Sequence, residues 1–213
     1  MKGFGNLLDG YRRFRSNRYE AEQGRWRQLA EGQAPRALVI ACSDSRADPA
    51  TIFDTDPGEI FVVRNVANLV PPYEANGGRH GVSAALEFAV TQLNVPEIVV
   101  MGHERCGGIE AALTGAFHGA AAGEGGFVHR WMEQVDEPAS EIAGRHGTGP
   151  EAARMLEEVA IRQSLANLRS FPFVAKREQA GDLAILGCHF SISEGQLYLL
   201  DEAEDCFHPV ATD

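Results

Sequence analysis

The stretch Ala37-Leu-Val-Ile-Ala-Cys42 is a short apolar run that ends directly in the polar sequence Ser43-Asp-Ser-Arg46. A continuous apolar run of this length, rich in β-branched residues, predicts a strand that is buried on both faces of a parallel sheet. The last residue of such a strand lies at the carboxyl edge of the sheet, where open parallel sheets bind their ligands. We therefore expect this stretch to define both the fold and the functional site.

Further segments alternate between the patterns of strands and helices. Apolar runs with β-branched residues predict strands at 60–63, 97–102 and 182–187, and a last alternation predicts an edge strand at 196–200. Apolar residues at helical spacing predict helices at 81–93, 109–117 and 152–168. This order predicts an α/β fold with a mostly parallel central sheet flanked by helices. No internal repeat or domain boundary is visible, so residues 1–213 are interpreted as a single domain.

The first 32 residues have a different pattern. Their apolar positions form one helical stripe, made of Phe4, Leu7, Leu8, Tyr11 and Phe14. Residues 1–32 are therefore predicted to form an N-terminal helical arm, which packs either on its own domain or on a partner chain. The arginines beside the stripe are interpreted as a solvated helix face. The Gly- and Ala-rich stretch 115–126 is predicted to be a flexible loop.

Composition excludes several classes of function. The formal net charge of −11 argues against partners such as nucleic acids or anionic membranes, which bind basic surfaces. The apolar runs are too short to span a bilayer, and no secretory signal is visible at the N-terminus. Four cysteines in a chain of 213 residues favour metal ligation over a disulfide framework. We therefore expect a reducing, cytoplasmic setting.

Two thiols and one imidazole follow the predicted strands. Cys42 ends the first strand, and His103 and Cys106 come directly after the strand at 97–102. If the two strands are neighbours, their carboxyl ends bring these side chains together. Two thiolates and one imidazole match a tetrahedral Zn²⁺ site with an open fourth position, as in catalytic zinc centres. The sequence thus predicts one Zn²⁺ per chain.

A carboxylate and a guanidinium lie beside the first cysteine. Asp44 and Arg46 are two residues apart, so in an extended segment both side chains point to one side. An arginine partner keeps such a carboxylate ionised and fixed in direction. Asp44 can then accept a hydrogen bond from zinc-bound hydroxide and orient it, or it can ligate zinc in a closed state. The simplest alternative is an ion pair that only braces the loop.

These motifs resemble those of the β-class carbonic anhydrases. The resemblance rests on Cys42-Ser-Asp44-Ser-Arg46, on residues 57–68 and on Gly102-His103-Glu-Arg-Cys106-Gly-Gly. Residues 61–73 are similar to the plant-type branch of the family, and the chain as a whole resembles its bacterial members. It implies Cys42, His103 and Cys106 as zinc ligands and Asp44 with Arg46 as the catalytic dyad. It also implies a substrate pocket, whose matching residues are Gln33, Phe61, Val66, Gly107 and Phe88.

The resemblance further implies an activity and an assembly. The activity is the reversible hydration of CO2 to bicarbonate and a proton by zinc-bound hydroxide, which Asp44 orients and Arg46 assists. The assembly is a homodimer, or a tetramer or octamer built from dimers, in which the sheet extends across the dimer. Two alternatives stay open: a carbon disulfide or carbonyl sulfide hydrolase on the same scaffold, and a non-enzymatic domain stabilised by zinc.

The chain departs from the family pattern at two places. Phe88 stands where the plant-type motif has a tyrosine, which removes one pocket hydroxyl. Arg64 matches the arginine of a regulatory bicarbonate triad, but Val39 and Phe190 stand at the other two positions, so we expect this regulatory site to be absent. The other cysteines and histidines are given no role in the metal site. Cys188 and His189 are interpreted as core or loop residues and Cys206 as a spare thiol, and five scattered histidines are interpreted as solvated or locally bonded: His80, His118, His129, His146 and His208.

Overall fold

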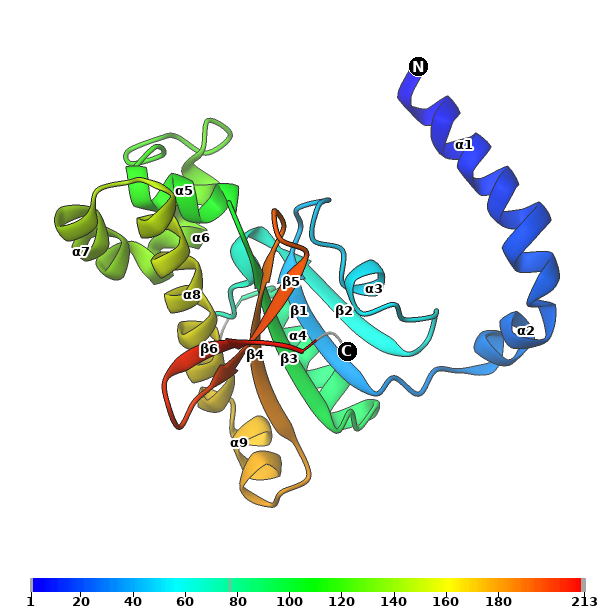
Figure 1. Ribbon diagram of the computed structural model, residues 1–213. Helices are drawn as coiled ribbons and strands as arrows, with labels where there is room; N and C mark the ends of the chain where they lie inside the picture. Colours follow the sequence, from blue (N-terminus) through cyan, green and yellow to red (C-terminus); the bar gives the residue numbers. More distant parts are fainter. Residues whose placement is uncertain (1, 77, 212–213) are drawn as a thin grey trace. The chain divides into compact units, whose positions relative to one another are not determined.

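The structure is a computed structural model that describes residues 2–76 and 78–211 (Figure 1). It divides into two compact units, the first ending at Ala34 and the second beginning at Pro35. The first unit contains helix α1 (Lys2–Phe14), a π-helical turn (Arg15–Tyr19) and helix α2 (Gln23–Glu31). The aromatic rings of Phe14 and Trp26 pack edge to face with centroids 5.3 Å apart, which joins α1 to α2. The predicted N-terminal helices are confirmed.

The second unit is built on one six-stranded sheet. Its strands are β1 (Ala37–Cys42), β2 (Ile60–Asn65), β3 (Glu97–His103), β4 (Ala184–Ser191), β5 (Gln196–Asp201) and β6 (Cys206–Pro209). The strand order is β2-β1-β3-β4-β5-β6. The first four strands are parallel, and β5 and β6 continue the sheet in antiparallel pairing. The predicted α/β class with a mostly parallel sheet is confirmed.

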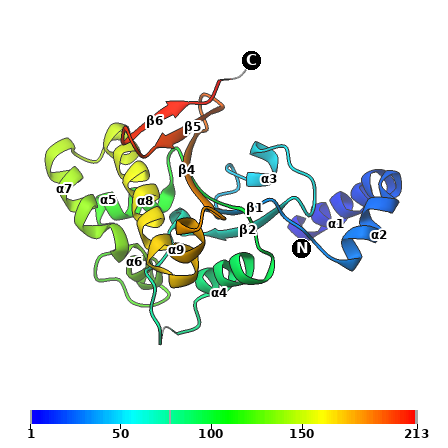
Figure 2. The ribbon, with the colours of Figure 1, turned by 90° about the horizontal axis from the view of Figure 1, so that it is seen from below.

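Helices connect the strands and cover the sheet unequally. They are α3 (Pro49–Ile52), α4 (Gly81–Glu87), α5 (Gly107–Thr114), α6 (Gly126–Met132), α7 (Asp136–His146), α8 (Pro150–Ser170) and α9 (Pro172–Gln179). A π-helical turn (Phe88–Gln92) extends α4, a 3-10 turn (Val66–Asn68) follows β2, and a second 3-10 turn (Glu133–Val135) precedes α7. Seen from below, α4, α8 and α9 gather on one face of the sheet, and the short α3 lies on the other (Figure 2).

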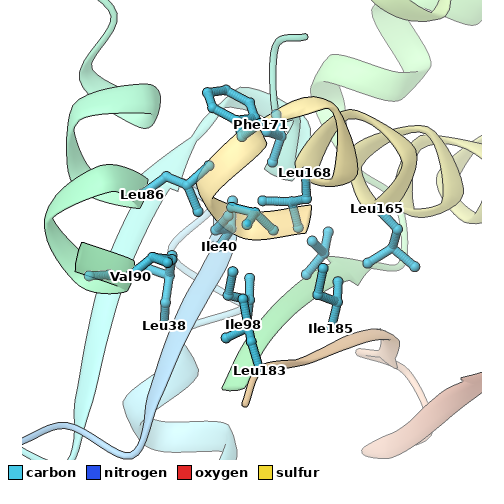
Figure 3. Packing of buried hydrophobic residues seen from close by; sticks show 14 of the residues in the cluster. Leu38, Ile40, Leu86, Val90, Ile98, Leu165, Leu168, Phe171, Leu183 and Ile185 are labelled. Carbon is cyan, nitrogen blue, oxygen red and sulfur yellow. The ribbon is translucent and has the colours of Figure 1, made fainter. Parts of the chain in front are cut away.

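The core follows the alternation of side chains along the strands. Leu38, Ile40 and Ile98 point toward α4, α8 and α9, where they pack with Leu86, Leu165 and Leu168 (Figure 3). Residues at the alternate positions of the same strands, such as Val39 in β1 and Met101 in β3, pack on the opposite face, under α3. Both sets are buried, which is why the strands are apolar throughout their length.

Two glycines let α8 approach the sheet closely. A Cβ atom on Gly102 in β3 or on Gly187 in β4 would lie 2.8 Å from side-chain carbons of Ile161. This is closer than packed carbon atoms approach, so a side chain at either position would force Ile161 to move and glycine allows the closest packing. The close packing places the N-terminal half of α8 directly behind the carboxyl ends of β3 and β4.

Several predicted boundaries are wrong. The strand predicted at 182–187 begins at Ala184 and continues to Ser191, because the polar residues His189 and Ser191 are buried inside the sheet. The helix predicted at 109–117 begins at Gly107 and ends at Thr114, where Gly115 adopts a left-handed conformation with φ 64°. Helices α3, α6, α7 and α9 and strand β6 were not predicted. Among the described residues, no helix is both long and apolar enough to cross a membrane.

Candidate metal centre and catalytic site

The structure brings the three predicted metal ligands together. Cys42 is the last residue of β1, and His103 is the last residue of the neighbouring strand β3. Cys106 lies three residues further on, at the N-cap of α5. Their ligand atoms all lie within 4.8 Å of one another, and all three residues are buried. The prediction from parallel strand ends is therefore confirmed as geometry.

The donor set fits a tetrahedral zinc ion. Two thiolates bound to zinc at about 2.3 Å are about 3.8 Å apart, and the Sγ atoms of Cys42 and Cys106 are 3.9 Å apart. The Nδ1 atom of His103 lies 2.9 Å from the carbonyl oxygen of Glu104, which can only accept a hydrogen bond. Nδ1 therefore carries the proton and Nε2 is left with a free lone pair. Nε2 is buried and has no hydrogen-bond partner among residues 2–76 and 78–211, as expected for a metal ligand.

The two thiols hold one another in different protonation states. A hydrogen bond from Cys106 lowers the pKa of Cys42 to about 4, against the opposing effect of burial. The same bond to Cys42, together with burial, raises the pKa of Cys106 above its usual range. The pair thus holds one thiolate and one proton, and binding of a divalent cation displaces that proton.

Asp44 and Arg46 form the predicted pair on the loop after β1. Arg46 donates from Nε to Oδ1 of Asp44 at 3.0 Å and from Nη2 to Oδ2 at 2.7 Å. These hydrogen bonds hold the pKa of Asp44 well below its usual range. Arg46 also donates to the carbonyl oxygen of Arg105 at 2.9 Å, which ties the loop after β1 to the loop after β3. In this arrangement both carboxylate oxygens of Asp44 face the guanidinium, and ligation by Asp44 in a closed state stays a prediction.

Arg64 shapes the loop that carries the dyad. From the end of β2, its guanidinium donates to the carbonyl oxygens of Cys42 at 2.9 Å and Asp44 at 2.5 Å. It also pairs with Asp48 at 2.9 Å, whose other oxygen caps the N-terminus of α3. The sequence singled out Arg64 only as a match to the arginine of the regulatory bicarbonate triad. The expected absence of that regulatory site is not tested by these contacts and stays a prediction. The structure gives Arg64 a direct part in positioning Cys42 and Asp44.

A buried carboxylate supports Cys106 from behind, and the sequence interpretation missed it. Oε1 of Glu157 in α8 accepts a hydrogen bond from the backbone N–H of Cys106 at 3.1 Å. Its Oε2 lies 2.8 Å from Nε2 of His189 in β4. Glu157 is 2% exposed and His189 is fully buried, so water cannot replace either partner. His189 was correctly placed in the core. The available signal was Glu157 itself, a charged residue on the apolar face of α8.

The loop between His103 and Cys106 has a second anchor. Glu104 accepts hydrogen bonds from the backbone N–H of Ser193 at 2.7 Å and from its hydroxyl at 3.0 Å. The backbone bond is the larger cause of a lowered pKa for Glu104. Ser193 lies in the turn between β4 and β5, so this contact fixes the metal-binding loop to the sheet. Arg105, at the centre of the loop, adopts a positive φ of 55°.

The predicted pocket residues divide into two groups. A Cβ on Gly108 would lie 2.6 Å from Val66, so Val66 packs against the start of α5 beside Cys106. The α-carbon of Gly107 faces open space there. Phe61 and Phe88 instead contact one another, with ring centroids 5.9 Å apart. Asn65 of β2 pairs with Cys42, and Phe61 lies four residues before Asn65. Phe61 is therefore about 13 Å from the Cys42 end of the strand. The fifth residue, Gln33, belongs to the first unit.

Four of the remaining cysteines and histidines lie in small clusters. All four cysteines are free. His118 and His129 pack with ring centroids 4.9 Å apart, and Asp136 completes that group. Cys206 and His208 lie together with Glu204 on the β5–β6 hairpin. The sequence left solvent exposure and local bonding both open for His118, His129 and His208 and gave Cys206 as a spare thiol, so it did not show which of these residues meet.

Comparison with known proteins gives consistent results. A family model described as carbonic anhydrase matches residues 37–197. A carbonic anhydrase from Pseudomonas aeruginosa is 38% identical over 97% of this chain and 91% of its own length. Beta carbonic anhydrase 3 from Arabidopsis thaliana is 38% identical over 89% of this chain and 73% of its own length.

Solved structures agree with these sequence relatives. The β-carbonic anhydrase CcaA superposes with a TM-score of 0.90 at 29% identity, over 100% of this chain and 94% of its own. A tetrameric β-carbonic anhydrase from Sordaria macrospora superposes with a TM-score of 0.80 at 26% identity, over 98% of this chain and 100% of its own.

Proposed function

Because the chain belongs to the β-class carbonic anhydrases, which are lyases, we propose that it catalyses the reversible hydration of CO2 to bicarbonate and a proton with one Zn²⁺ per chain. The observation that supports this proposal most strongly is the buried cluster of Cys42, His103 and Cys106 beside an ion-paired Asp44. A purely structural metal needs no such oriented carboxylate at its side.

The residues of the site have distinct proposed roles. Cys42, His103 and Cys106 would hold the zinc ion, which lowers the pKa of a bound water to about 7 and so supplies a nucleophile at neutral pH. Asp44 would accept a hydrogen bond from the attacking oxygen and direct its lone pair toward CO2. Arg46 keeps Asp44 ionised, because its hydrogen bonds hold the pKa of that carboxyl low. The acidic form of Asp44, which would donate rather than accept, is thereby excluded at neutral pH.

The pocket for CO2 would be assembled from more than one chain. Val66 and Gly107 lie beside the ligand cluster, whereas Phe61 lies further along β2 and packs against Phe88 in the π-helical turn after α4. Strand β2 is an edge of the sheet, and apolar side chains are exposed along it: Val62 on the strand itself and Phe88, which packs against Phe61. We propose that a second copy pairs along this edge, extends the sheet across a dimer and brings Gln33, Phe61 and Phe88 to the partner's site.

Assembly beyond the dimer follows the same reasoning. Within the first unit, helix α1 leaves the apolar stripe of Phe4, Leu7 and Tyr11 uncovered, and we propose that a partner chain covers it. One of the structural neighbours is described as tetrameric. The proposed assembly is therefore a homodimer or an oligomer built from dimers. A cytoplasmic location stays a prediction, which is in keeping with four free thiols.

The substitution Asp44→Ala tests the proposed role of the carboxylate. We expect the variant to retain one zinc per chain, because Asp44 is not one of the three clustered ligands, and to lose most of its CO2 hydration. General acid–base groups typically contribute ~10²–10⁴-fold in rate, which sets the size of the expected loss. Stopped-flow CO2 hydration and metal analysis on the same preparation measure both quantities.

The variant Asp205→Ala is a matched control on the β5–β6 hairpin, where a carboxylate is also paired with an arginine. It should keep full hydration activity. Full activity in Asp44→Ala would refute the mechanism. Turnover of carbonyl sulfide or carbon disulfide without CO2 hydration would favour the sulfur hydrolase instead.

A further inference from the structure

The hairpin formed by β5 and β6 carries a second cluster of metal-ligating side chains, separate from the Cys42 site. Its members are Glu204, in the turn, and Cys206 and His208, on β6. The Nε2 atom of His208 lies 2.9 Å from Sγ of Cys206 and 2.9 Å from Oε2 of Glu204. Sγ of Cys206 lies 3.6 Å from the same carboxylate oxygen. One thiol, one imidazole and one carboxylate therefore converge on a single point.

The backbone of the hairpin explains why these side chains meet. Cys206 and His208 are two residues apart on a strand, so their side chains leave the same face of the sheet. The intervening Phe207 points the other way, where it packs against the core and under the guanidinium of Arg162 at 5.0 Å. The pairing of Cys206 with Asp201 fixes the register of the two strands.

The turn is held independently of the three ligands. Oδ1 of Asp201 accepts hydrogen bonds from the backbone N–H groups of Ala203 at 2.8 Å and Glu204 at 3.1 Å. Arg162 in α8 pairs with the carboxylate of Asp205 at 2.6 Å and donates to its carbonyl oxygen at 2.9 Å. Asp205 adopts a positive φ of 52° where the turn enters β6, and the two contacts with Arg162 hold this residue at the base of the cluster. The ligand frame is thus preorganised by residues that are not ligands.

We propose that Glu204, Cys206 and His208 form a second Zn²⁺ site, with water as the fourth ligand. Zinc prefers thiolate, imidazole and carboxylate donors in tetrahedral geometry. Donors at about 2.0–2.3 Å from such an ion are about 3.4–3.6 Å apart. The Cys206–Glu204 separation already has this value, and the two contacts of His208 need to open by about 0.5–0.7 Å. The two short contacts are both made by the ring of His208. Because this side chain is about half exposed, the ring can rotate and lengthen both distances.

Such a site would fasten the edge of the sheet without taking part in catalysis. The ligands lie on the two outermost elements, β6 and the turn that precedes it, whereas the Cys42 cluster lies at the ends of β1 and β3. The side chains of Glu204 and His208 are more than half exposed, so an ion can enter from solvent. The second site would therefore bind more weakly and exchange faster than the buried one.

Zinc titration of the full-length protein tests the proposal. Protein loaded with one equivalent of zinc is titrated with further Zn²⁺ against a chromophoric chelator. We expect a second equivalent per chain, and we expect Cys206→Ser and His208→Gln each to weaken its binding at least ~10-fold, because loss of even an outer-shell partner of a ligand has an effect of this size. His146→Gln is the matched control, because His146 is an exposed histidine at the end of α7 outside all three clusters. It should retain the second equivalent.

A mapping experiment separates this site from the alternatives. Addition of the second equivalent should slow amide hydrogen exchange in 196–209 in the wild-type protein and not in Cys206→Ser. Circular dichroism spectra that match the wild type show that the variants are folded. The proposal is overturned if only one equivalent binds. It is also overturned if the second equivalent persists in both Cys206→Ser and His208→Gln, or if His118→Gln alone removes it, which would assign it to the cluster with His129 and Asp136.

Discussion

The substitution Glu157→Leu tests whether the metal-binding loop depends on the buried carboxylate behind it. Leucine has a similar volume and a high helix propensity, so α8 and its packing are preserved. What disappears is the acceptor for the N–H of Cys106 at 3.1 Å and the partner of His189 at 2.8 Å. Because the site is 2% exposed or less, water does not replace them.

The expected cost follows from these two contacts. A buried donor that loses its partner costs ~1–3 kcal/mol, and hydrogen bonds to charged groups lie at the upper end. Two such losses give about 4 kcal/mol in the free energy of unfolding. For a chain of this size each kcal/mol lowers the melting temperature by about 2–4 °C, so we expect a decrease of about 8–16 °C. Loss of such a supporting contact also weakens metal retention by ~10–100-fold.

Two further variants separate this role from a general effect of removing charge. Glu157→Gln keeps an acceptor for Cys106, and its amide can donate to Nε2 of His189 in the other ring tautomer, so most stability and zinc retention should return. Glu158→Leu is the matched control, since Glu158 is a quarter exposed and pairs with Arg154 at the surface. It should cost at most about 1 kcal/mol.

Thermal unfolding and the rate of zinc transfer to a chelator measure both effects on the same samples. Equal melting temperatures and equal zinc release for Glu157→Leu and Glu158→Leu would refute the reasoning.

Three other outcomes are expected. Gly187→Ala places a Cβ 2.8 Å from Ile161 and should destabilise the fold by ~1–3 kcal/mol in urea unfolding; wild-type stability would contradict the packing argument. Cys106→Ser should release zinc to a chelator faster than the wild type, and unchanged retention would exclude Cys106 as a ligand. Arg169 lowers the pKa of Glu202, so this pair stabilises the protein above the pKa of an unfolded glutamate, and the contribution is lost as the pH falls through the lower folded-state pKa. Glu202→Gln should therefore lower the melting temperature at neutral pH and lose this effect in acid; an equal decrease at all pH values would contradict it.

The sequence predicted the parts of the structure that depend on local patterns. The strand at Ala37–Cys42 is correct to the residue, because both of its faces are buried and its apolar run is unbroken. The cluster of Cys42, His103 and Cys106 followed from one rule, that neighbouring parallel strands end at the same edge. The rule applies here because β1 and β3 are neighbours in the sheet order β2-β1-β3.

Contacts between distant residues were not predictable from local patterns. Glu157 meets Cys106 only because glycines in β3 and β4 let α8 approach the sheet, and these glycines have no periodic signal. Strand β6 is four residues long and contains a proline, so neither length nor alternation distinguishes it from a loop. Phe61 and Phe88 were expected in the pocket from the resemblance, and within one chain they contact each other.

The most direct test of the central claim is CO2 hydration by the purified protein as a function of its measured zinc content. Stopped-flow rates at neutral and mildly alkaline pH are compared for preparations in which zinc has been removed in steps and then restored. The proposed function predicts rapid turnover that rises in proportion to the zinc held per chain and returns when zinc is restored. A preparation with one zinc per chain and no CO2 hydration at either pH would contradict it.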